Sequence, residues 1–345
     1  MHFGTAAVCC QLHGVSAGIT TSIPLGSSMD YSLKNVRIAG TGSAVPARIV
    51  TNQDISNMGV PVKDDWIIEN LGIRQRHIAD NESTTDLATR AALAAMENAG
   101  IDREEISLIL LATITPDRKA PSTACLVKHR LGMTNLAPAL DISAACSGFM
   151  YGLTIAGNLI RSGVHKNALV ICCDRMSSIT DWSRRDCIFF GDGAAAVVLT
   201  ESSYENSLFE ARIFSNTEFT DGATVFEGDS AFTMDGHAVY EAASSALPGS
   251  IVSVLLRCGL SEEDLTWVIP HQPSIKILKK MAEQLGIPFE KVCHNMERYA
   301  NTSGVSIPLL LDEVNRAGKL KKDDLVAFAG VGAGWTFGAA IYRWH

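Results

Sequence analysis

ENAGIDREEISLILLAT, residues 97–113, and LLRCGLSEEDLTWVIPHQ, residues 255–272, present the same succession of features in two distant parts of the chain. Each segment reads as the end of a helix, a glycine that stops it, an acidic turn and an apolar strand. Gly100 aligns with Gly259, and the acidic and apolar positions that follow keep the same offset of 159. A constant offset over several elements predicts that the chain contains an internal duplication.

A second pair of segments supports the duplication. ALDISAACSGF (139–149) and VCHNMERYANTSGVSIPLLL (292–311) each contain a turn of small residues and a Ser-Gly before a helix. Because helices alternate with continuous apolar strands, we expect βαβ units with parallel sheets that are covered on both faces. Loops from two such halves meet at the centre, which is where a composite active site is expected. The strands that complete the pattern are NALVICCD (167–174) and DGAAAVVL (192–199), then DLVAFAG (324–330) and FGAAIYRW (337–344).

The domain organisation follows from where this pattern begins. Residues 1–28 contain no Lys or Arg and no apolar stretch of membrane-spanning length, so they are typical of neither a secretory signal nor a transmembrane helix. We expect a weakly structured extension over 1–28, one half over 29–202 and a second half over 203–345.

Composition limits the class of protein. A chain of 345 residues that is 47% hydrophobic and 19% charged can bury a large core, and its formal net charge of -8 argues against a nucleic-acid partner. Nine cysteines include the adjacent pairs Cys9/Cys10 and Cys172/Cys173, without a CxxC motif or Cys/His metal spacing. We therefore expect no metal site, no disulfide framework, no membrane segment and a cytoplasmic location.

Cys146 stands in DISAACSGFMYGL (141–153), where an apolar run stops and an amphipathic segment begins. We expect Gly148 to allow an unusual backbone angle at this junction. A thiol at the start of a helix has its pKa lowered by the helix dipole, which favours a nucleophile. The alternative is a buried, inert cysteine, which is common for this residue type.

Two further motifs favour the nucleophile. His271 ends an apolar strand in VIPHQPS (268–274), and Asn301 lies in the turn of ERYANTSGVSIP (297–308). With A-A-C-S-G-F around Cys146 and a terminal G-A-G-W-T-F-G-A-A, the chain from about Lys34 to His345 resembles the β-ketoacyl-acyl carrier protein synthase III family. The resemblance implies a duplicated thiolase-like fold, layered α-β-α-β-α, with two mixed sheets around central helices.

The resemblance also implies a division of chemical roles. Cys146 takes the acyl group of an acyl-CoA primer, because a thiolate attacks a thioester and keeps the acyl group activated. His271 and Asn301 then stabilise the enolate that malonyl-acyl carrier protein forms when it loses CO2. The backbone amides of Cys146 and Ala333 form an oxyanion hole, and the coenzyme A thioester is a substrate, so no cofactor is expected.

Relatives with other chemistry differ at identifiable positions. Thiolases, which remove a proton, carry a second cysteine in the C-terminal glycine loop, here AGVGAGWTFG (329–338), which has none. The glutamate expected beside the nucleophile of a hydroxymethylglutaryl-type synthase is also absent from the sequence around Cys146. Ordinary turns explain the glycines of this loop as well as an oxyanion hole does; they are Gly330, Gly332 and Gly334.

Substrate recognition rests on fewer residues. The resemblance implies that Trp66 packs on the adenine of coenzyme A, that Arg184 or Arg185 covers its other face, and that Gly236 contacts substrate. Asn70 stands where the family often carries a second arginine, which favours weaker phosphate binding or a donor other than coenzyme A. For Trp66, core packing is the alternative.

The last expectations concern partners. Lys276, Lys279 and Lys280 lie in a segment of helical period and are expected to form a patch for an acidic acyl carrier protein, unless they are only a solvated face. Ala120, before Pro121, matches the position that forms the floor of the partner's acyl pocket in a homodimer. Alanine there favours a longer, branched or aromatic primer, with a dicarboxylic primer at Arg118 and Lys119 as the alternative.

The sequence is therefore consistent with three functions. The first is the initiating condensation of fatty-acid synthesis. The second is a specialised-metabolite condensing enzyme or acyltransferase that uses the same cysteine, which the unusual Pro273-Ser274 dipeptide and Asn70 favour. The third is a scaffold that kept the fold and lost turnover, against which the intact Cys146, His271 and Asn301 argue.

Overall fold

A computed structural model of the chain describes residues 35–217, 220–225 and 231–345. The extension predicted over residues 1–28 lies outside the described residues.

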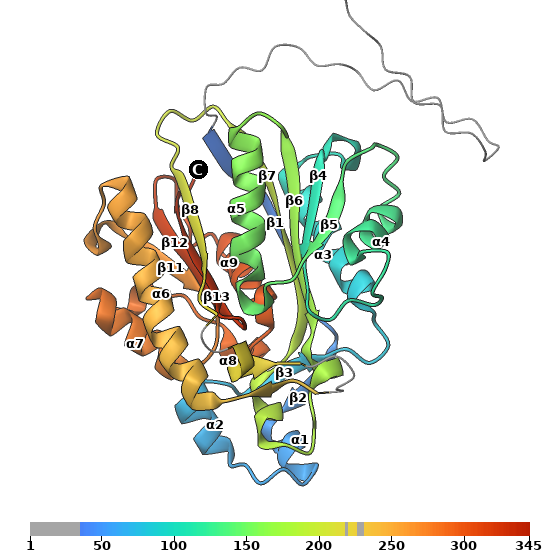
Figure 1. Cartoon of the computed structure of the whole chain (residues 1–345), viewed down its shortest axis with the longest axis vertical. Coiled ribbons are helices and arrows are strands. Elements are labelled where there is room, and N and C mark those ends of the chain that lie inside the picture. The colour runs from blue at the N-terminus through green and yellow to red at the C-terminus, as the bar shows by residue number, and fades with distance from the viewer. Residues whose placement is uncertain (1–34, 218–219, 226–230) are drawn as a thin grey trace, which may run out of the picture. The chain divides into compact units, whose positions relative to one another are not determined.

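Five strands form the first sheet: β1 (Asn35–Ala44), β4 (Leu108–Ala112), β5 (Ala139–Ile142), β6 (Asn167–Arg175) and β7 (Asp192–Ser202). Their order is β1-β7-β6-β4-β5 (Figure 1). β4 pairs in parallel with β5 and β6, whereas β7 runs antiparallel to β6 and β1.

Four strands form the second sheet: β8 (Phe209–Ser215), β11 (Trp267–Pro270), β12 (Leu325–Gly332) and β13 (Thr336–Arg343). Their order is β11-β12-β13-β8, with β11 and β12 parallel and the other two pairs antiparallel. Both sheets are therefore mixed and not purely parallel, because the last strand of each half, β7 or β13, returns antiparallel to its neighbour.

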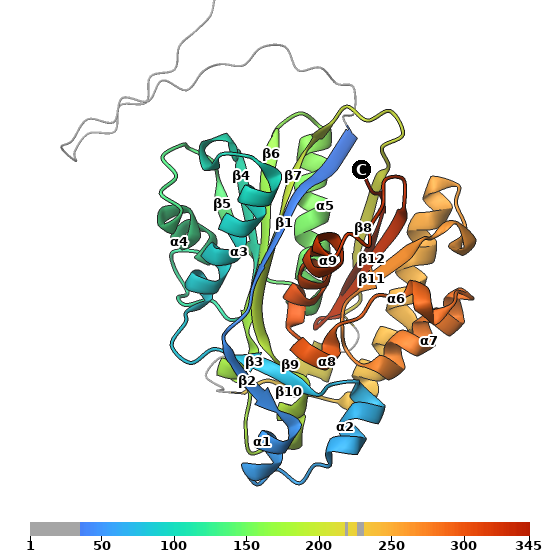
Figure 2. The ribbon, with the colours of Figure 1, turned by 180° about the vertical axis from the view of Figure 1, so that it is seen from behind.

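Six helices cover the sheets: α3 (Thr84–Ala99), α4 (Thr123–Arg130), α5 (Gly148–Arg161), α6 (Gly236–Cys258), α7 (Ile275–Leu285) and α9 (Ser306–Arg316). α3 and α4 pack on the outer face of the first sheet, and α6 contacts the second sheet and α7 on its outer side. α5 and α9 contact both sheets and lie between them, as the two opposite views show (Figures 1 and 2). This arrangement confirms the predicted α-β-α-β-α layers.

The alternation of buried residues along the strands explains the layers. Leu111 of β4 joins the core under α3, whereas its neighbour Leu110 joins the central core with α5 and α9. In the same way, Phe328 of β12 faces the central core and Ala327 faces α6. Successive strand residues point to opposite faces, so a continuous apolar strand can fill two cores at once.

The structure confirms the duplication at the level of single residues. α3 ends before Gly100 and α6 before Gly259, and both glycines cap their helix in the left-handed conformation, with φ of 65° and 66°. A short 3-10 turn follows each cap, over Arg103–Glu105 and Glu262–Asp264. β4 and β11 then begin at equivalent positions, so the offset of 159 holds through helix end, cap, turn and strand. The boundary between residues 202 and 203 stays a prediction.

Smaller elements stand at the edge of this framework. β2 pairs with β3 and β9 with β10, in both cases antiparallel. They are β2 (Arg48–Thr51), α1 (Asn52–Asn57), α2 (Asp64–Leu71), β3 (Gln75–Ile78), β9 (Ala223–Thr224), β10 (Thr233–Met234) and α8 (Met296–Tyr299).

α6 is the one helix among the described residues that is long and apolar enough to cross a membrane by length and composition. It packs along β12 and β13, and core helices of globular proteins pass the same test.

Candidate active site

Cys146 lies where the sequence places it, in a short 3-10 turn (Ala145–Ser147) between β5 and the first residue of α5. The unusual backbone angle of this junction is at Ala145, with φ of 45°, and not at Gly148, which is helical with φ of -53°. The expectation for Gly148 was therefore wrong. Its lack of a side chain serves packing instead, because a Cβ there would stand 2.7 Å from the Cβ of Ala112.

β12 approaches the nucleophile turn very closely at Gly332. A Cβ on Gly332 would stand 2.8 Å from the Ala144 oxygen and from the backbone nitrogens of Cys146 and Ser147. Real Cβ atoms do not approach backbone atoms so closely, so this position requires glycine. Ordinary turn chemistry does not account for Gly332.

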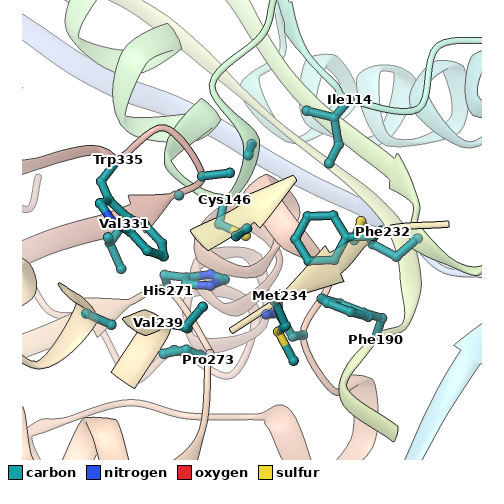
Figure 3. Close-up of a pocket in the computed structure, with 17 residues that line it drawn as sticks. Ile114, Cys146, Phe190, Phe232, Met234, Val239, His271, Pro273, Val331 and Trp335 are labelled. Carbon is teal, nitrogen blue, oxygen red and sulfur yellow. The ribbon is translucent and has the colours of Figure 1, made fainter. Parts of the chain in front are cut away.

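One cavity brings the three predicted catalytic residues together. Cys146 and His271 line it and lie close together (Figure 3). Asn301 lines it too, and so does Ala333, the residue predicted for the oxyanion hole. His271 follows the end of β11, and Asn301 follows α8. The wall is otherwise largely apolar, with Ile114, Met176, Phe190, Phe232, Met234, Val239, Val331 and Trp335 among its residues.

His271 is neutral over the whole physiological pH range. It is 2% exposed, and burial lowers the pKa of its imidazole to about 3. Its Nδ1 lies 2.7 Å from the hydroxyl oxygen of Ser306, at the start of α9. Nε2 is then the ring nitrogen left to act in the cavity that His271 lines.

Asn301 is oriented by the backbone of its own turn. Its Oδ1 accepts a hydrogen bond of 2.8 Å from the Ser303 backbone N–H. Because the oxygen is engaged, the amide presents its NH2 group as the donor. This arrangement makes Asn301 a suitable partner for a developing negative charge.

The thiol of Cys146 does not have the lowered pKa that its place beside a helix predicted. Burial raises the pKa of Cys146 to about 12, and the charge of Asp174 acts in the same direction. That expectation was wrong because burial is the largest influence on the pKa of this thiol. A nearby base must therefore take the thiol proton.

A buried carboxyl group that the sequence did not single out lies beside the nucleophile. Asp174 ends the buried part of β6, and its Oδ1 accepts hydrogen bonds from Thr113, Ile114 and Thr115, whereas its Oδ2 has no partner. Burial raises the pKa of Asp174 to about 6. The Ser303 hydroxyl makes no well-aligned hydrogen bond to the described residues. It lies close enough to Cys146 and Asp174 to lower the pKa of both groups.

Two hydroxyl groups tie the glycine loop to the nucleophile turn. Ser147 donates to Thr336 at 2.8 Å, and Thr336 donates to the Ala333 oxygen at 3.0 Å. These bonds hold Ala333 next to Cys146. Neither residue was predicted, because their contact joins positions 189 apart in the sequence.

The residues predicted to bind coenzyme A lie together in an outer pocket. Trp66, Arg184, Arg185 and Gly236 all line it. Arg185 stacks on Trp66, with its Cζ 4.3 Å from the ring centroid, whereas Arg184 pairs with Asp186 at 2.9 Å. Arg185 is therefore the arginine that lies on the Trp66 ring, and the choice between Arg184 and Arg185 for coenzyme A stays a prediction.

A middle cavity connects the outer pocket to Cys146. It shares Phe189, Met234 and Gly236 with the outer pocket, and it shares Val239 and Asn301, among others, with the inner cavity. The three cavities therefore adjoin one another in sequence between Trp66 and the thiol.

Lys276 reaches across this path to the position where an arginine was missing. Its Nζ lies 2.5 Å from Oδ1 of Asn70, and both residues line the middle cavity. α7 therefore places a cation beside position 70. Lys279 is exposed on the same helix, and Lys280 pairs with Glu283 at 3.0 Å.

Ala120 is exposed in the single chain and does not line the cavity of Cys146. Its expected role depends on a second copy of the chain, so it stays a prediction.

Comparison with known proteins agrees with this geometry. Residues 140–217 match the family described as 3-oxoacyl-(acyl-carrier-protein) synthase III, and residues 255–344 match its C-terminal part. The β-ketoacyl-(acyl-carrier-protein) synthase III of Ehrlichia canis (strain Jake) is 43% identical over 320 residues, covering 90% of this chain and 100% of the relative.

Two solved structures of condensing enzymes are also similar to this chain. The 3-oxoacyl-(acyl-carrier-protein) synthase III of Aquifex aeolicus VF5 is 39% identical with a TM-score of 0.87, over 90% of this chain and 100% of that one. The priming β-ketosynthase of the R1128 polyketide biosynthetic pathway is 28% identical with a TM-score of 0.86, over 92% and 99%.

Proposed function

We propose, from the premise that this chain belongs to the β-ketoacyl-(acyl-carrier-protein) synthase III family, that it condenses an acyl-CoA primer with malonyl-acyl carrier protein and releases CO2. The product is a β-ketoacyl thioester, and the reaction initiates fatty-acid synthesis. The observation that carries the proposal is the single cavity that Cys146, His271 and Asn301 share.

The first step is acylation of Cys146. The thiol needs a proton acceptor because its pKa is raised. Nε2 of the neutral His271 takes the proton in step with the attack of the sulfur on the primer carbonyl. The amides of Cys146 and Ala333 receive the negative charge on the carbonyl oxygen. The departing coenzyme A thiolate takes the proton from His271, which leaves an acyl-enzyme and a neutral histidine.

The second step is decarboxylative condensation. Loss of CO2 from the malonyl group creates an enolate, and the donors of His271 and Asn301 stabilise its oxygen as the charge develops. The carbon attacks the acyl-enzyme, and Cys146 leaves as a thiolate that regains a proton from solvent. The apolar wall of the cavity strengthens these interactions because it excludes water.

The path from Trp66 to Cys146 suits a long thioester arm. Trp66 and Arg185 offer an aromatic face and a guanidinium for the nucleotide end, and Lys276 offers a cation along the way. Lys276, Lys279 and Lys280 on α7 provide the basic face for the acidic carrier protein. We further propose a cytoplasmic homodimer that needs no cofactor.

A specialised priming condensation is the second candidate. Asn70 and the Pro273-Ser274 dipeptide favour it, since all three residues line the middle cavity through which the substrate arm passes. The chemistry at Cys146 is the same, and only the primer or the acceptor differs.

Incubation with a panel of acyl-CoA primers, followed by intact-mass and peptide analysis, tests the proposal. We expect one acyl group per chain, located on Cys146, and its absence in Cys146→Ala. Failure of acetyl, branched, medium-chain and aromatic primers alike to label Cys146 would contradict it.

A further inference from the structure

His271 and Ser306 form a buried hydrogen-bonded pair with a third member. The Ser306 hydroxyl oxygen lies 2.7 Å from Nδ1 of His271 and 3.0 Å from the carbonyl oxygen of Ser303. The three residues are 2%, 1% and 0% exposed. Water therefore does not compete for these bonds.

The hydroxyl has one hydrogen and two acceptors within reach. When it donates to the Ser303 carbonyl, its oxygen can accept only from an N–H at Nδ1 of His271. When it donates to Nδ1 instead, that nitrogen must be unprotonated. Rotation of one hydroxyl thus decides which nitrogen of the neutral imidazole carries the proton.

The two arrangements give the cavity opposite properties. With the proton on Nδ1, Nε2 is an acceptor, which suits removal of a proton from the Cys146 thiol. With the proton on Nε2, the same nitrogen is a donor, which suits stabilisation of the enolate. Since a neutral imidazole has one N–H, it cannot offer both properties in one tautomer.

We propose that Ser306 is a positioning residue whose hydroxyl selects the tautomer of His271, so that one histidine serves as acceptor during acylation and as donor during decarboxylation. The change of tautomer needs no net proton, because the ring gives up the proton on Nδ1 and gains one on Nε2. His271 takes the Cys146 proton at Nε2 while it holds its own at Nδ1. Nε2 then protonates the departing coenzyme A thiolate, which returns the first tautomer. The second tautomer forms when Nε2 takes a proton from solvent in the emptied cavity, Nδ1 releases its proton to solvent, and the Ser306 hydroxyl rotates to donate to Nδ1.

Without the Ser306 hydroxyl, the imidazole of His271 loses a possible donor and keeps the Ser303 carbonyl, which is an acceptor, beside it. The Ser303 carbonyl lies close enough to His271 to raise the pKa of the imidazole, and a carbonyl can only accept. Ser306→Ala therefore fixes the proton on Nδ1. Acylation continues, and decarboxylation loses a donor.

The test separates the two half-reactions and rests on the proposed function for its activity arm. Ser306→Ala should acylate Cys146 within a few-fold of wild type and release CO2 from malonyl-acyl carrier protein about 100-fold more slowly. Ser306→Thr keeps a hydroxyl and should restore decarboxylation. Ser250→Ala is the matched control, because Ser250 is also buried on a helix and donates to the carbonyl three residues earlier, at 3.0 Å.

A second measurement does not depend on turnover. Nitrogen-15 spectra of histidine-labelled protein, with His271 assigned from His271→Gln, should show exchange between tautomers in wild type and protonated Nδ1 alone in Ser306→Ala. Identical tautomers in the two proteins, or equal slowing of both half-reactions, would overturn the inference. Absence of both half-reactions in wild type would instead refute the proposed function, and the spectra would still decide the role of Ser306.

Discussion

Ala145 and Ser303 occupy equivalent positions in the two halves, and both have the left-handed backbone that non-glycine residues rarely adopt, with φ of 45° and 56°. Ala145 precedes the nucleophile Cys146, and Ser303 follows Asn301 and reaches both Cys146 and Asp174. Each turn lies directly before a central helix, α5 or α9. The duplication therefore places two strained turns face to face, and the active site lies between them.

Asn301 and His271 should differ when each is replaced by alanine. Asn301→Ala keeps the thiol and its base, so we expect normal acylation and a loss of about 100- to 1,000-fold in condensation. His271→Ala should slow both steps, because the buried thiol also loses its base. Single-turnover acylation and CO2 release, measured separately, check this; normal acylation in His271→Ala would contradict the role of base.

Asp174 should make stability depend on pH in an unusual direction. Its pKa is raised to about 6 from 3.8, so the folded state holds a proton that the unfolded state has lost between these values. The free energy of unfolding should therefore fall as pH rises through this window, by at most about 3 kcal/mol. Buried His271 contributes with the opposite sign, so the two must be separated by mutation.

The variant Asp174→Asn isolates this contribution. It should be more stable than wild type at pH 7.5, by more than at pH 5, in urea unfolding monitored by fluorescence. The surrounding titratable groups, Cys146, Cys172, Cys173 and Asp192, remain in both proteins. An unchanged difference between the two pH values would show that Asp174 is already ionised at pH 5.

Gly332→Ala should disable the site from a position that carries no reactive group. The added methyl collides with backbone atoms of the Cys146 turn, so we expect lower stability by about 1–3 kcal/mol and loss of acylation. Gly249→Ala is the control, because nothing lies within 4 Å of the added methyl in that helix. Thermal unfolding and acylation rates should be measured for both variants. Equal stability and equal acylation rates in the two would contradict the close approach of Gly332 to the Cys146 turn.

Ala120 should set the primer preference in a dimer. The methyl group of Ala120 takes less space than the ring of a phenylalanine at that position, which leaves room for a longer acyl chain. Each CH2 of the chain that becomes buried contributes about 0.8 kcal/mol to binding. We expect wild type to prefer medium-chain or branched primers over acetyl, and Ala120→Phe to reverse that order. Steady-state rates with both primers decide, together with the oligomeric state in solution; a strict acetyl preference in wild type would contradict the expectation.

Features that depend on residues close together in the chain could be predicted from the sequence. The repeated helix end, glycine cap and strand gave the duplication, and the motifs around Cys146, His271 and Asn301 gave residues that share one cavity. Ser306 lies in the motif around Asn301, but the sequence predicts no role for it, because its partner His271 is 35 positions away and meets it only when α9 packs beside β11.

Properties that depend on the whole environment could not be predicted. The pKa of Cys146 is set by the density of atoms around it, which the order of residues does not express. Which of Arg184 and Arg185 lies on the Trp66 ring depends on the path of the backbone opposite Trp66. The contact of Lys276 with Asn70 joins residues 206 positions apart.

The most direct test of the central claim is a complete reaction with an acyl-CoA primer and malonyl-acyl carrier protein, followed by mass spectrometry of the carrier protein. The account predicts a β-ketoacyl group on the carrier, one CO2 released for each group formed, and neither product with Cys146→Ala. Transfer of the primer to the carrier without loss of CO2, or product formation by Cys146→Ala, would contradict it.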